Sequence, residues 1–157
     1  MFEHFSDRAR LWAYGFEVRL TPAQRDVVEE ALRRFVENWQ VHGKPVKGDF
    51  IILENQIALL VTDDDVSGCS IDSSVAVFKE INMTHGWNAL NQNLVFFRSK
   101  RGIEAVSRPE FQVLVAAGEI TDDTKVLDFT CTTLGQLRAG GFERPFSESW
   151  HAAAFAS

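Results

Sequence analysis

The chain has 157 residues, of which 45% are hydrophobic and 24% charged, and its formal net charge is −6. This composition is typical of globular proteins, which excludes disorder as the dominant state and suits one domain or two small lobes. The acidic balance excludes the broad basic surface that nucleic acids and anionic membranes require. We therefore expect neither a nucleic acid nor a membrane as partner.

The start of the chain and its cysteines bear on localisation. Residues 1–8 are interrupted by charges and contain no apolar segment of the kind found in signal peptides. The longest clean apolar run, residues 57–61, is far too short to cross a bilayer. Two cysteines, Cys69 and Cys131, do not form a disulfide framework, and we interpret Cys131 as structural. These features predict a cytoplasmic protein with reduced thiols.

The first half of the chain predicts a strand, a helix, a hairpin and a second helix. Apolar residues alternate at positions 12, 14, 16 and 18, as in a strand. Thr21 and Gln24 form a capping box around Pro22, which predicts a helix over 22–41 that ends near His42-Gly43. A hairpin is expected over 50–53 and 57–61, and a helix over 71–84. The expected buried residues are Val28, Leu32, Phe35, Ile71, Val75 and Phe78.

The second half predicts a hairpin over 94–97 and 103–106, followed by a helix over about 108–117. A strand near 125–129 should follow, and the apolar tail with Trp150 and Phe155 should pack back and help to seal the joint between the lobes. Hairpins dominate, which favours an α+β fold with a mainly antiparallel sheet and two main helices. We divide the chain into an α+β lobe over 1–92 and a small hairpin-helix-strand lobe over 93–157.

Motifs for common cofactors are absent. The sequence has no phosphate-binding loop, no dinucleotide fingerprint and no nucleophile elbow. It also lacks a C-x-x-C pair and histidines at zinc-ligand spacing. We therefore expect no cofactor, no metal and no nucleotide hydrolysis.

The segment Ser67-Gly68-Cys69-Ser70-Ile71-Asp72-Ser73-Ser74 is the main candidate site, because it joins an apolar strand to a predicted helix start. Backbone amides at a helix start favour negative charge, so they can bind an anionic ligand or activate a thiol. In the enzymatic alternative, Cys69 is the nucleophile, His42 the base and Asp72 the group that orients it. In the simpler alternative, Ser70 caps the helix and Cys69 is a small buried filler.

Ligand binding without catalysis uses a related set of side chains. Paired tryptophan and histidine residues can line a pocket for a small polar ligand. The candidate ligand-binding residues are Ser67, Gly68, Ser70, Ser73, Ser74, Trp39 and Trp150. Burial of both tryptophans in the core is the alternative.

Two resemblances accompany these patterns. The strings Trp39-x-x-His42-Gly43-x-Pro45, Ser67 to Val75, Gly118-Glu119-Ile120-Thr121-x-x-Thr124 and Ser149-Trp150 resemble a family of short uncharacterised bacterial proteins, often labelled ABC transporter ATPases. That family implies a shared fold but no known activity. Residues 93–139 are similar to bacterial GYF-like domains, which are associated with protein or peptide binding, although the glycine-and-tryptophan ending after the strand is missing.

Three functions remain open on the sequence. The first is a small ligand-binding or interaction protein whose site is the Ser67–Ser74 segment. The second is a thiol-dependent enzyme that uses Cys69 with His42 as base. The third is an adaptor that binds a peptide through the C-terminal lobe.

Overall fold

The computed structural model describes residues 2–63 and 68–155, with the side chains at 41 and 68–71 outside that description. The chain forms two compact units. Unit 1 comprises Met1–Asn91 and Thr132–Gly135, and unit 2 comprises Gln92–Cys131 and Gln136–Ser157. In the described ranges, no helix combines the length and apolar character needed to cross a membrane.

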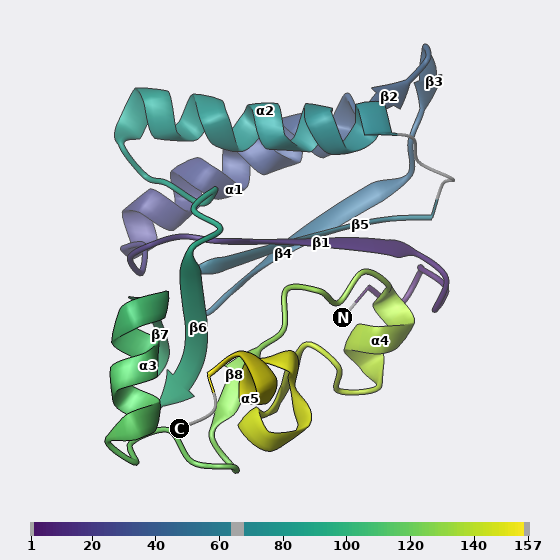
Figure 1. Cartoon of the computed structure of the whole chain (residues 1–157). Coiled ribbons are helices and arrows are strands. Elements are labelled where there is room, and N and C mark those ends of the chain that lie inside the picture. Colours follow the sequence, from purple (N-terminus) through teal and green to yellow (C-terminus); the bar gives the residue numbers. More distant parts are fainter. Residues whose placement is uncertain (1, 64–67, 156–157) are drawn as a thin grey trace. The chain divides into compact units, whose positions relative to one another are not determined.

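Unit 1 is an antiparallel sheet with two helices on one face (Figure 1). The strands are β1 (Arg10–Gly15), β4 (Gly48–Leu53) and β5 (Ile57–Thr62), in the order β1-β5-β4. The helices are α1 (Pro22–Glu37) and α2 (Gly68–His85). The sheet is antiparallel throughout, which confirms the predicted α+β architecture and the hairpin of β4 with β5.

The core of unit 1 lies between this sheet and its helices. Val28 and Leu32 of α1 and Phe78 of α2 are fully buried, as their helical spacing predicts, and Phe35 and Val75 are half-buried. Ile71 lies outside the described side chains. β5 is the central strand and is buried at every position, and its Ala58 and Leu60 belong to the core that the helices cover.

The first helix is shorter than its apolar pattern predicts. It ends at Glu37, and residues up to Pro45 form a small hairpin of β2 (Gln40–Val41) and β3 (Lys44–Pro45). His42 and Gly43 both adopt left-handed backbone angles, with φ of 51° and 78°. This is the chemistry of a tight hairpin turn, so the prediction that His42-Gly43 closes a helix was wrong.

Two strands also end before the predicted positions. β1 ends at Gly15, and Val18 is 68% exposed in the connection to α1. In unit 2 the short strand β8 (Lys125–Leu127) ends before Phe129. Both apolar runs continue past the last backbone pairs that hold the strand, so alternation alone overestimates strand length.

Unit 2 is a four-stranded antiparallel sheet in the order β7-β6-β8-β9. Its elements are β6 (Leu94–Ser99), β7 (Gly102–Ser107), α3 (Arg108–Ala116), β8, β9 (Glu143–Pro145), a short 3-10 helix (Phe146–Glu148) and α5 (Trp150–Ala154). The helix α4 (Leu134–Arg138) begins in unit 1 and ends in unit 2. Phe111 of α3 is fully buried and packs on Phe97, Phe146 and Phe155. Phe155 therefore belongs to the core of unit 2, as part of a tail that packs back.

Candidate functional site

The predicted Ser67–Ser74 site falls at the beginning of α2. Ser67 lies outside the described residues, and for Gly68, Cys69 and Ser70 only the helical backbone is described. Ser70 is inside the helix rather than before it, so its predicted capping position was wrong. The Cys69 side chain is outside the described part of the structure, so its distance from His42 is not tested. The thiol-enzyme hypothesis therefore stays a prediction.

The described end of this segment contains one buried and two exposed polar residues. Asp72 and Ser73 are exposed on α2. The Ser74 side chain is fully buried, and its hydroxyl lies 2.6 Å from the phenol oxygen of Tyr14 on β1. Burial raises the pKa of Tyr14, while the hydrogen bond from Ser74 opposes that shift. Ser74 thus joins α2 to the sheet.

Trp39 and His42 occupy opposite environments. Trp39 is buried beside Phe35 and Trp12, with ring centroids 4.7 and 6.0 Å away. A Cβ at Gly48 would lie 2.7 Å from the Trp39 ring, so this indole fills the space against β4. His42 is exposed on the β2–β3 turn. The two residues are close in sequence, but one side chain is in the core and the other is at the surface.

Trp150 and its neighbour His151 differ in burial. Trp150 is 38% exposed, whereas His151 is 2% exposed, so the alternative in which both tryptophans are buried in the core holds for Trp39 but not for Trp150. The two rings stack with centroids 3.9 Å apart, and the Arg108 guanidinium lies 5.6 Å from the indole. The exposed indole therefore rests on a buried imidazole, and Trp150 remains available as a contact residue at the surface of unit 2.

His151 is held in a neutral form. Its Nδ1 lies 3.0 Å from Ser149 Oγ, and its backbone N–H donates to the same oxygen as a helix cap. Burial lowers the pKa of His151 to about 4, a shift that the charge of Asp128 opposes and that of Arg108 supports. In the sequence, the only feature that points to His151 is its position next to Trp150.

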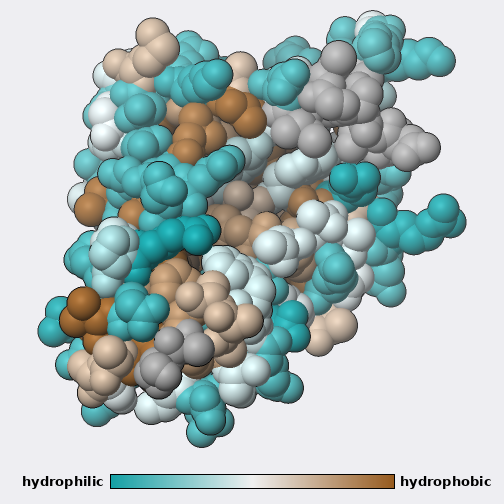
Figure 2. Space-filling model, in the orientation of Figure 1, coloured by the Kyte–Doolittle hydropathy of each residue, from teal (hydrophilic) through white to brown (hydrophobic). Residues whose placement is uncertain are grey.

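An open groove on unit 2 has a volume of about 930 Å³. We call it the α3–β7 groove after two of the elements that line it, α3 and β7, which supply five of its eleven lining residues. Its apolar lining residues are Phe97, Val106, Val113, Leu114 and Ile120, and its polar ones are Ser99, Lys100, Arg101, Glu104, Glu110 and Glu119. Val113 is 66% exposed, and Figure 2 shows apolar surface over α3 next to charged side chains.

One carboxylate of the groove is already engaged. Glu110 accepts the backbone N–H of Ser107 at 3.0 Å, and the Ser107 hydroxyl accepts the N–H of Glu110. These hydrogen bonds lower the pKa of Glu110. They are the predicted capping box, and they fix the sharp join between β7 and α3 that shapes one end of the groove.

The edge of β7 is open along this groove. In the described part of the chain, β7 has a neighbouring strand only on the β6 side. The N–H of Ser107 bonds to the Glu110 carboxylate rather than to β6. Because amide directions alternate along a strand, the N–H of Ala105 points to the same open side. A backbone donor therefore lies beside the apolar groove.

The described residues contain no cluster of three or more histidine, cysteine or acidic side chains able to hold a metal ion. Comparisons with protein-family models, with curated proteins and with solved structures gave no match.

Proposed function

We propose that the protein is a peptide-binding interaction protein whose site is the α3–β7 groove of unit 2. The observation that carries the proposal is the combination of an open strand edge, an apolar floor and a cavity of about 930 Å³ in one place. An extended peptide can add to a strand edge through its backbone and insert alternate side chains into a neighbouring groove. The similarity of residues 93–139 to GYF-like domains supports the same class of partner.

The lining of the groove specifies the kind of peptide. A strand beside β7 would direct every second side chain toward Val106, Val113 and Leu114, so we expect apolar residues at alternate positions. Lys100 and Arg101 are balanced by Glu104 and Glu119, with Glu110 engaged in the capping box. Affinity should therefore come from backbone bonds and apolar contact, and it should change little with salt.

Selection from a random peptide display library against the full-length protein tests this proposal. We expect the selected peptides to alternate apolar and other residues. Val113→Glu should weaken the binding of such a labelled peptide by at least about tenfold, because it places a charge in the apolar contact. Fluorescence polarisation measures the affinity at low and high salt.

Val18→Glu is the matched control. Val18 lies in unit 1 and is 68% exposed, compared with 66% for Val113, so the two substitutions alter surface apolarity equally. The control should bind the peptide like the unmodified protein. Peptides that bind equally well to the Val113→Glu variant, or a library that gives no binder, would contradict the proposal.

A further inference from the structure

The two edges of the unit 1 sheet differ in whether another segment of the chain bonds to the edge strand. At the β1 edge, the returning segment Thr132–Gly135 bonds to the chain, with Leu11 N–H donating to Thr132 O and Leu134 N–H donating to Ala9 O, both at 2.9 Å. At the other edge, β4 has a strand on one side only within the described ranges. An open edge of six residues is a template for pairing with another strand.

The backbone of β4 is oriented for such pairing. The N–H of Phe50 donates to its neighbour Asp49 Oδ1 at 2.8 Å and so points away from β5. Because amide directions alternate, the N–H of Ile52 points outward as well. The Asp49 carboxylate thus occupies one outward donor of β4, and an incoming carbonyl would have to replace it there.

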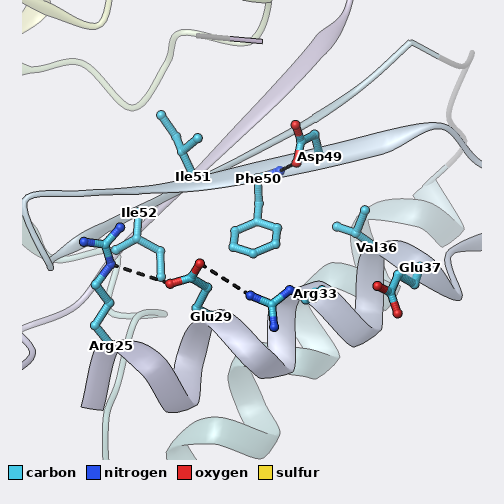
Figure 3. Close-up of a pocket in the computed structure, with 9 residues that line it drawn as sticks. All are labelled: Arg25, Glu29, Arg33, Val36, Glu37, Asp49, Phe50, Ile51 and Ile52. Atoms are coloured by element: carbon cyan, nitrogen blue, oxygen red, sulfur yellow. Dashed lines mark hydrogen bonds and ion pairs between the residues drawn. The ribbon is translucent and has the colours of Figure 1, made fainter. Parts of the chain in front are cut away.

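A groove of about 470 Å³ runs between this edge and α1 (Figure 3). Phe50, Ile52 and Val36 supply apolar surface, and Figure 3 shows Phe50 and Ile52 pointing toward α1. The α1 wall also carries four charged residues at a spacing of four: Arg25, Glu29, Arg33 and Glu37. Their charges alternate along the helix as plus, minus, plus and minus.

This charge order is complementary to itself. A two-fold axis beside position 31, midway between Glu29 and Arg33, would bring Arg25 next to Glu37 of the partner subunit and Glu29 next to Arg33 of the partner subunit. Every cation would meet an anion, and each contact would occur twice, as an isologous interface requires. We propose that the α1–β4 face binds a second copy of this chain, with β4 antiparallel to β4 of the partner subunit.

The strand register agrees with this axis. If the two β4 strands pair about Ile51, the outward backbone N–H and C=O groups of Phe50 lie opposite those of Ile52 of the partner subunit. This is the arrangement of a hydrogen-bonded antiparallel pair. The charged side chains of α1 are partly solvated and already pair within the helix, since Glu29 lies 3.5 Å from Arg33 and 3.9 Å from Arg25. They therefore determine the register and orientation of the dimer more than its affinity. Affinity comes from the strand pairing and the covered apolar groove.

Reciprocal charge reversal in the full-length protein tests the dimer. In the Arg33→Glu variant, Glu29 would face a second carboxylate across the axis, and in the Glu29→Arg variant, Arg33 would face a second guanidinium. Each variant alone should dimerise about tenfold more weakly than the unmodified protein. An equimolar mixture of the two should restore dimerisation, because every facing pair is then opposite in charge. Sedimentation equilibrium over a concentration series measures all four samples.

A second reciprocal pair and a control keep the test decisive. Arg25→Glu and Glu37→Arg change the outer contacts and should behave in the same way, alone and mixed. They keep the test possible if either inner variant fails to fold. Arg34→Glu changes a helix charge that pairs with Glu30 and does not line the groove, so it should dimerise normally. A monomeric unmodified protein, single variants that dimerise normally, or a mixture without restoration would each overturn the proposal. This inference rests on unit 1 alone and is independent of peptide binding by unit 2.

Discussion

The hydroxyl of Ser74 on α2 lies 2.6 Å from the phenol oxygen of Tyr14 on β1, and both side chains are buried. The bond joins a helix to a sheet across the core of unit 1, next to the stacked ring of Phe78, whose centroid is 4.1 Å from that of Tyr14. Ser74 was a candidate ligand-binding residue, and its position gives it a role in stability that can be measured.

Ser74→Ala should destabilise the protein by about 1–3 kcal/mol, because it leaves a buried phenol without this partner. The adjacent Ser73 is exposed, so Ser73→Ala should change the free energy of unfolding by about 0.5 kcal/mol or less. Urea denaturation of both variants makes the comparison. Equal effects of the two substitutions would contradict a stabilising bond between Ser74 and Tyr14.

Gly48 is predicted to be intolerant of a side chain. A Cβ there would lie 2.7 Å from the Trp39 ring, so Gly48→Ala should cost about 1–3 kcal/mol through overpacking. In a Trp39→Leu background the same substitution should cost less, because the ring that it meets is gone. A double-mutant cycle in urea measures this coupling, and additive costs would show that the two residues do not compete for space.

The tail supplies a contrast between two aromatic residues. Phe155 is 5% exposed against Phe111, so Phe155→Ala should cost about 3–5 kcal/mol. Trp150 is 38% exposed, so Trp150→Ala should cost about 1 kcal/mol. Chemical denaturation gives both values. If Trp150→Ala proved the more damaging, the indole would have to be more deeply packed than the structure places it.

Local signals in the sequence correctly predict the starts of α1 and α3, but not that of α2. The capping boxes at Thr21 and at Ser107 both form, each with its backbone and side-chain bonds, because all their partners lie within four residues. Helix ends were less predictable. Trp39 continues the apolar spacing of α1, yet the chain already leaves the helix at Asn38, whose side chain donates to Arg34 O.

Features formed by distant segments could not be predicted in this way. Thr132–Gly135 covers the β1 edge although it is more than 100 residues away in the chain, and nothing in its composition indicates that position. The α3–β7 groove also depends on how a helix lies over a strand edge. Its exposed Val113 looks in the sequence like an ordinary member of a helical apolar pattern. Only the pairing of strands shows which edges stay open.

The neutral His151 should make the stability of the protein depend on pH. Its pKa is about 4 in the folded protein and about 6.5 in an unfolded chain, so the unfolded state binds more protons between these values. Stability should therefore fall as the pH drops from about 6.5 to 4, by up to about 3 kcal/mol for this group. Above pH 7 the imidazole is neutral in both states and contributes no pH dependence.

His151→Asn should remove this part of the pH dependence, because the amide does not titrate in that range. His42→Asn is the control, since it makes the same substitution at a histidine that is exposed on the β2–β3 turn. Urea unfolding at several pH values between 4 and 7.5 gives the free energy of unfolding as a function of pH for each protein. Subtracting the His151→Asn profile from that of the unmodified protein cancels the contribution of the carboxylates, which both proteins share. A His151→Asn variant whose stability still falls with the slope of the unmodified protein would show that His151 does not titrate on unfolding.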